Sequence, residues 1–159
     1  MDVTDKPENQ EIVIKPSKNM QTFTLVTITA SNIFSIIPIR ELYCQKRYYG
    51  MCLTTCASIA SVFMHMTETK HNLKGLCLAK YSKIFLNIDR FLAYLTGFYG
   101  LYLFYNNPTK TVSQVIVPLI GGCCAAIGER TENLPLYTTL HTTWHFCAYY
   151  GLKLASFFL

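Results

Sequence analysis

Hydrophobic residues fall into five long stretches that carry no Asp, Glu, Lys or Arg, and the charged residues are confined to the segments between them. The stretches are Asn19–Ile39, Tyr48–Thr67, Phe91–Thr109, Thr111–Gly128 and Asn133–Leu152. Each is close to the roughly 20 residues that a helix needs to cross the hydrocarbon core of a bilayer. A soluble helix shows one face to water and would carry charges along its whole length. The pattern therefore predicts an all-α integral membrane protein, a bundle of about five transmembrane helices.

The segments between the stretches set the expected boundaries. We expect helices over Thr22–Ile39, Tyr48–Met66, Asp89–Tyr105, Val112–Ile127 and from Asn133 to about Leu159. Residues Met1–Met20 are polar and of mixed charge, so they form a tail ahead of a transmembrane domain over residues 21–159. The segment Thr67–Asp89 mixes four lysines with apolar residues, which is typical of a loop and an interfacial helix.

Composition supports the membrane interpretation and leaves one alternative open. The chain is 51% hydrophobic and 14% charged, against about 25% charged residues in an ordinary soluble domain. The mean hydropathy is only +0.24, because several stretches are rich in Thr, Ser and Tyr, so a soluble bundle of unusually apolar helices stays possible. The net charge of +5 is spread over loops and forms no basic, aromatic-lined surface for nucleic acid. The seven cysteines include no CxxC pair and are expected to be reduced packing residues.

The distribution of basic residues predicts the orientation. With five spans, the tail, the Thr67–Asp89 segment and the loop over 128–133 share one side of the membrane. That side holds nine of the 14 Lys and Arg residues. Because basic loops tend to remain in the cytoplasm, we expect the N-terminus on the cytoplasmic side.

Polar residues with possible chemistry occur at corresponding ends of three expected helices. Ser61 and His65 lie near the end of the second helix, Asp89 opens the third, and His141 and His145 lie in the first turns of the fifth. Residues four apart share a helical face. Because successive spans alternate in direction, these groups should meet at one membrane face, the cytoplasmic one. Three neutral imidazoles with one open position form a catalytic zinc arrangement.

Each of these groups has a possible role at such a centre. A zinc-bound water has its pKa lowered to about 7. Asp89 would accept a proton from that water or orient it, and Ser61 would hydrogen-bond the water or a developing oxyanion. The structural alternative is that each histidine only packs or bonds a nearby carbonyl, and that Asp89 caps the third helix or pairs with Arg90.

Four further ionisable residues carry no predicted role. His71 is expected to be a solvated residue of the polar loop. The other three, at helix margins, are Glu68, Glu129 and Glu132.

The order of these motifs resembles a membrane superfamily that includes the alkaline ceramidases, the adiponectin and progestin receptors, the post-GPI-attachment lipid-remodelling proteins and the myomaker-like proteins. The segments that carry the resemblance are SVFMHMTETKH, LNIDRFLAY and LHTTWHFCAYYG, within Tyr48–Gly151. The resemblance implies Zn²⁺ held by three histidines, with Ser61 and Asp89 beside it, and hydrolysis of an amide or ester bond in a membrane lipid; the implied ligands are His65, His141 and His145. It also implies a reduced version of a seven-helix fold, with helices missing between the aspartate and the paired histidines.

The sequence thus supports two classes of function. The first is a zinc-dependent membrane hydrolase whose substrate is a lipid amide or ester. The second is a non-enzymatic membrane protein (a receptor, a fusion factor or a complex subunit) in which a closed metal site or a polar cluster joins the helices. A cavity that is wide enough for an acyl chain and reaches the metal would distinguish the first from the second.

Overall fold

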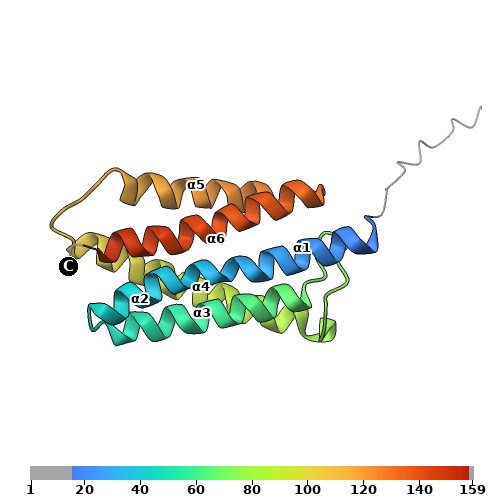
Figure 1. Ribbon diagram of the computed structural model, residues 1–159, viewed down its shortest axis with the longest axis horizontal. Helices are drawn as coiled ribbons and strands as arrows, with labels where there is room; N and C mark the ends of the chain where they lie inside the picture. Colours follow the sequence, from blue (N-terminus) through green and yellow to red (C-terminus); the bar gives the residue numbers. More distant parts are fainter. Residues whose placement is uncertain (1–15, 158–159) are drawn as a thin grey trace, which may run out of the picture.

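The computed structural model describes residues 16–157, and within this range all regular structure is helical. Five helical rods run alternately up and down a single bundle (Figure 1). The first rod is continuous and consists of α1 (Lys18–Ser31), the 3-10 turn η1 (Asn32–Ser35) and α2 (Ile36–Cys44). The others are α3 (Tyr48–Thr67), α4 (Ser82–Asn106), α5 (Ser113–Gly128) and α6 (Leu134–Ser156). Most of the expected polar tail, residues 1–15, lies outside the described residues.

The first rod is longer at both ends than the sequence predicts. Its N-terminus is at Lys18 because the side chain of Ser17 accepts a hydrogen bond from the backbone N–H of Met20, as an N-cap does. Pro38 does not end the helix. Proline lacks a backbone N–H, and the chain accommodates this with the 3-10 turn just before α2 instead of terminating.

The segment between α3 and α4 also differs from the expectation. Residues 68–78 form a loop, a short 3-10 turn η2 follows at Ala79–Tyr81, and α4 then begins at Ser82 and continues without a break to Asn106. The expected separate interfacial helix over Thr67–Asp89 is therefore wrong for this part of the described chain. Charged side chains do not end a helix, and Asp89 lies about two turns inside α4 rather than at its start.

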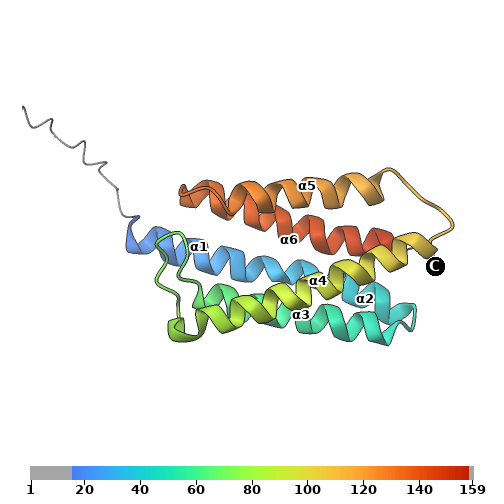
Figure 2. The same ribbon diagram turned by 180° about the vertical axis from the view of Figure 1, so that it is seen from behind.

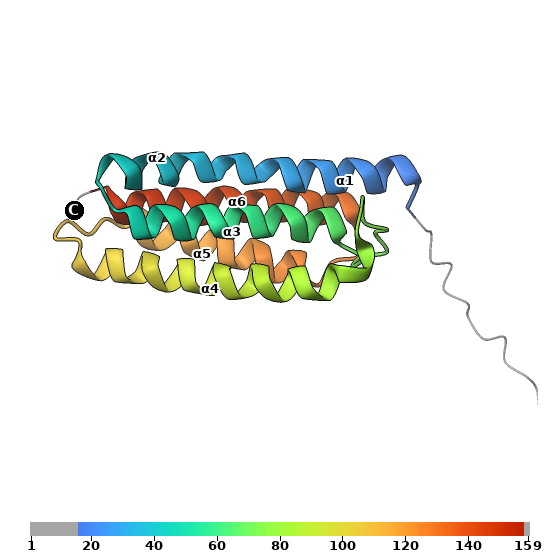
Figure 3. The same ribbon diagram turned by 90° about the horizontal axis from the view of Figure 1, so that it is seen from below.

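Helix α6 occupies the centre of the bundle. It packs against α1, α2, α4 and α5, whereas α3 packs between α2 and α4; Figures 2 and 3 show the same arrangement from behind and from below. Helix α5 approaches α6 closely at Gly121, where an added Cβ would lie 2.7 Å from the Cβ of Cys147 on α6. The neighbouring Gly122 faces away and meets nothing within 4 Å. No comparable packing joins α4 to α5.

Two of the described helices are long and apolar enough to cross a membrane. They are the first rod, Lys18–Cys44, whose most apolar 18 residues have a mean hydropathy of 1.6, and α3, for which the same mean is 1.2. Helix α5 is apolar but has only 16 residues. Helices α4 and α6 have 25 and 23 residues but do not reach the same mean hydropathy, since Tyr, Thr, Asn and Gly interrupt their apolar residues.

Candidate metal centre

The structure brings His65, at the end of α3, together with His141 and His145 from the first half of α6. One ring nitrogen from each lies within 4.8 Å of those of the other two. The ring centroids are 4.6 to 5.2 Å apart. All three side chains are buried, with exposed fractions of 0%, 9% and 5% in chain order. The end of α3 and the start of α6 lie at the same end of the bundle because the rods alternate in direction (Figure 1). We call these residues the histidine cluster.

His65 is held by a buried carboxylate. Its Nδ1 lies 2.9 Å from Oε2 of Glu68. Burial alone would raise the pKa of Glu68, but the hydrogen bonds from His65 and from the hydroxyl of Tyr137 help bring this pKa below its ordinary value, which favours the carboxylate. A carboxylate only accepts, so Nδ1 of His65 is the protonated nitrogen. Its Nε2 is buried and has no hydrogen-bond partner among the described residues.

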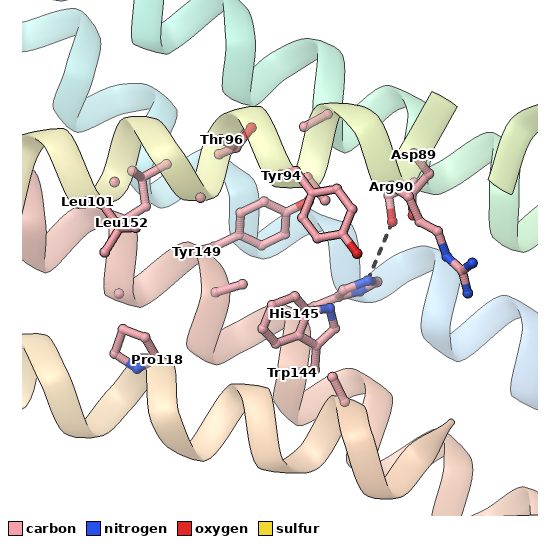
Figure 4. A pocket seen from close by; sticks show the side chains of 18 of the residues that line it. Asp89, Arg90, Tyr94, Thr96, Leu101, Pro118, Trp144, His145, Tyr149 and Leu152 are labelled. Carbon is pink, nitrogen blue, oxygen red and sulfur yellow. Dashed lines mark hydrogen bonds between the residues drawn. The ribbon is translucent and has the colours of Figure 1, made fainter. Parts of the chain in front are cut away.

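The tautomer of His145 is fixed in the same way by a serine of α1. Nδ1 of His145 lies 2.6 Å from Oγ of Ser31, and that hydroxyl donates its proton to the carbonyl oxygen of Ile28 at 2.6 Å. Ser31 must therefore accept from Nδ1–H, which leaves the lone pair on Nε2. That Nε2 lies 3.4 Å from Oγ of Ser61 on α3, the contact drawn as a dashed line in Figure 4.

The histidine cluster fits a zinc ion. Zn²⁺ binds neutral imidazole nitrogens at about 2.0–2.1 Å, which in a tetrahedron places two such nitrogens about 3.3 Å apart. The observed limit of 4.8 Å requires only small side-chain rotations to reach this spacing. Two of the three rings carry their lone pair on Nε2: that of His145 faces Oγ of Ser61 at 3.4 Å, and the buried Nε2 of His65 is an orphaned atom that a metal would satisfy. The donor set suits zinc and other borderline transition metals.

The centre lies at one end of a cavity of about 630 Å³ between α3, α4, α5 and α6. Ser61, Asp89, His141 and His145 are among the residues that line it. Figure 4 shows Asp89 and His145 at the same end of the cavity. Mostly apolar side chains line the rest of the cavity, as far as Ala155, with Thr96 and Gln114 as polar residues among them. The charged and histidine side chains are thus concentrated at one end, and the cavity beyond them is largely apolar.

Asp89 occupies neither of the structural roles considered for it. Helix α4 begins at Ser82, so Asp89 does not cap it. Among the described residues Asp89 forms no ion pair, and Arg90 instead lies 3.9 Å from a carboxylate oxygen of Glu129. Asp89 is half-buried on the cavity wall, on the same side as Ser61.

The groups that surround the histidine cluster were not predicted from the sequence. Tyr137 donates a 2.6 Å hydrogen bond to Oε1 of Glu68. His71 is half-buried, with its ring centroid 4.1 Å from that of Tyr137, so the expectation of a solvated His71 is wrong. The His-x-x-Glu spacing of His65 and Glu68 is a signal that could have found the carboxylate, because residues three apart are neighbours on a helix. No comparable sequence signal points to Ser31.

Comparisons with known proteins return no match, whether with family models, with curated proteins or with solved structures. The site is therefore interpreted from its own residues.

Proposed function

We propose that this chain is a multi-pass membrane protein that holds a zinc ion at the histidine cluster and hydrolyses an amide or ester bond in a membrane lipid. The outward faces of the bundle support membrane embedding, since most side chains of α4 and α5 are exposed and many of these are large and apolar. The excess of Lys and Arg at the end of the bundle that contains the cluster supports a cytoplasmic location for this end.

One observation carries the proposal: His141 and His145 of the histidine cluster line a largely apolar cavity of about 630 Å³, and His65 lies fully buried beside them. A purely structural zinc site is closed by a fourth protein ligand, whereas a catalytic one keeps a position open. Among the described residues, three ligands group together and no fourth His, Cys, Asp or Glu joins them. A cavity of this size and lining accommodates an acyl chain with its polar linkage at the metal end. The resemblance in motif order to lipid-hydrolysing membrane proteins supports the same substrate class.

The residues of the centre have complementary roles in this reaction. A bound Zn²⁺ supplies Lewis acidity, polarising a carbonyl group and lowering the pKa of a water molecule to about 7. The hydroxyl of Ser61, next to Nε2 of His145, donates a hydrogen bond to the oxyanion that develops from the substrate carbonyl. The carboxylate of Asp89 takes the proton from the attacking water and returns it to the leaving amine or alkoxide. The apolar wall excludes bulk water and positions the acyl chain.

Metal analysis of detergent-purified protein tests the proposal. Wild-type protein should contain about one zinc per chain, and His65→Ala should lose most of it, because two remaining imidazoles hold zinc far more weakly than three. The control is Glu132→Gln, which changes an exposed carboxylate outside the cluster and should leave the zinc content unchanged.

The proposed hydrolysis is tested by a separate measurement of fatty-acid release. Zinc-loaded protein should release fatty acid from at least one lipid amide or ester in a panel of ceramides and phospholipids, and Ser61→Ala should slow this release. Well-folded wild-type protein that binds no zinc would show that the proposal is wrong. Protein that binds zinc and hydrolyses nothing would leave only a structural metal site.

A further inference from the structure

A buried carboxylate lies directly behind the histidine cluster. Glu68 follows the last residue of α3, and its side chain turns back along the helix toward His65, three residues earlier. Both residues are buried. A buried carboxylate is costly unless its oxygens are hydrogen-bonded, so the partners of each oxygen show what holds it there.

Each oxygen of Glu68 has its own donor, and the two donors come from different helices. Oε2 accepts from Nδ1 of His65 on α3 at 2.9 Å, and Oε1 accepts from the hydroxyl of Tyr137 on α6 at 2.6 Å. A carboxylate held at both oxygens cannot rotate away from the imidazole. Tyr137 therefore fixes Glu68, and Glu68 fixes the ring plane of His65.

The surroundings exclude water from this pair of bonds. Tyr137 is 1% exposed and belongs to an apolar cluster with four buried side chains: Leu25, Ile28, Leu73 and Leu134. The ring of His71 covers Tyr137 from the loop after α3, where His71 and Asn72 both adopt positive φ angles of 56° and 61°. Hydrogen bonds in such a dry environment are stronger than in water.

The hydrogen bond between Nδ1 of His65 and Glu68 determines the state of the other ring nitrogen, Nε2. With Nδ1–H donated to a carboxylate, Nε2 carries the lone pair, and it is buried without a partner among the described residues. A carboxylate behind an imidazole also raises the basicity of the ligating nitrogen. We propose that Glu68 and Tyr137 are positioning residues, which hold His65 in its metal-binding tautomer and orientation and so set the affinity of the cluster for zinc. This inference depends on the zinc site proposed above.

The test compares the zinc dissociation constants of three variants with that of the wild type, measured on detergent-purified protein by competition with a chelator. Glu68→Gln keeps the shape and an acceptor for Nδ1–H but removes the charge, and we expect zinc binding ten- to a hundredfold weaker. Tyr137→Phe removes one hydroxyl and leaves the bond between Glu68 and His65, so we expect a loss of about threefold to tenfold. The control is Glu132→Gln, an exposed carboxylate in the loop before α6, which should bind zinc as the wild type does.

The melting temperature of the metal-free protein separates positioning from simple stabilisation. A structural role alone would lower the melting temperature of Glu68→Gln and leave the dissociation constant of its folded fraction unchanged, which would overturn the inference. Wild-type affinity in both Glu68→Gln and Tyr137→Phe would overturn it too, while the proposed metal site would stand. If the wild type itself binds no zinc, the proposed function fails instead.

Discussion

The two sides of the bundle are built in opposite ways. On the side formed by α1, α3 and α6, polar side chains are buried and bonded across helices. Thr138 donates to Thr24 at 2.9 Å, Tyr149 donates to Asn32 at 2.8 Å, and Ser31 accepts from His145. On the side formed by α4 and α5, Leu103 is the only buried residue of α4. Large apolar residues there face outward; for example, Phe91, Phe98, Leu101 and Leu119 are each more than 60% exposed.

This contrast indicates which side of the bundle is held together by hydrogen bonds and which side bounds the cavity. In lipid, apolar surface gains nothing by leaving its surroundings, so helices associate through packing and hydrogen bonds between helices. The α1–α3–α6 side has many such bonds and carries the histidine cluster. The α4–α5 side has few and bounds the cavity. Under the proposed function, the first side would position the reacting groups and the second would leave room for a lipid chain.

The largest expected effect comes from a substitution that fills the cavity and leaves the histidine cluster unchanged. Ala148 lines the cavity one turn beyond His145. Ala148→Phe places an aromatic ring in the path of the acyl chain, and we expect kcat/KM for lipid hydrolysis to fall at least a hundredfold. Zinc content should stay at the wild-type level, because residue 148 contacts none of the hydrogen bonds that hold the imidazoles.

The control for this variant is Ala30→Phe, which adds the same ring at an exposed position of α1. It should preserve both activity and zinc. Equal loss of activity in Ala30→Phe and Ala148→Phe would mean that the cavity has no special part in catalysis. Loss of zinc in Ala148→Phe would mean that the two sides of the bundle are not separable.

Much of the fold was predictable because it depends on local signals. Charge-free stretches predicted the five rods, and the last rod begins within one residue of the expected start, with Asn133 as its N-cap accepting from the backbone N–H of Leu136. Successive rods alternate in direction, so the end of the second rod lies at the same end of the bundle as the start of the fifth. This alternation was enough to predict that His65 lies near His141 and His145. The start of α4 was not predictable in this way, since Lys83 and Asp89 are as compatible with a helix interior as with a loop.

The groups around the metal ligands could not be predicted for a different reason. The bond between Tyr137 and Glu68 joins residues 69 apart, and that between Ser31 and His145 joins residues 114 apart. Their formation depends on the rotation of each helix about its own axis, which is set by packing. Glu68 illustrates the limit, because its sequence position at a helix margin is equally suited to a solvated side chain.

A smaller effect is expected at the close contact between α5 and α6. Gly121 of α5 has no room for a side chain, because its added Cβ would meet Cys147 at 2.7 Å and Trp144 at 3.2 Å. Gly121→Leu should push α5 from α6 and lower the free energy of unfolding by about 1–3 kcal/mol. Thermal melts in detergent would measure this loss. Gly122→Leu, next to it but facing outward with nothing within 4 Å, should change it little; equal destabilisation by both variants would contradict the packing of α5 on α6.

The smallest effect tests whether the hydrogen bonds of the rigid side act on the metal or only on the helices. Ser31→Ala removes the acceptor of Nδ1–H of His145, so the proton is free to occupy Nε2 and compete with the metal. We expect zinc binding about tenfold weaker and a stability loss of about 1 kcal/mol from the unpaired buried group. The measurement is again chelator competition with a thermal melt.

Ser35→Ala is the matched variant for Ser31→Ala, one turn further along the same rod. Ser35 bonds Ser58 of α3 at 2.9 Å and contacts no metal ligand through a hydrogen bond. Its loss should lower stability by a similar amount, about 1 kcal/mol, and leave the zinc dissociation constant unchanged. If both variants weaken zinc binding equally, the serines act on the metal through helix packing, and the tautomer of His145 is not what Ser31 controls. If only Ser31→Ala does so, the polar bonds of this side have two separable roles, one in joining helices and one in orienting a ligand.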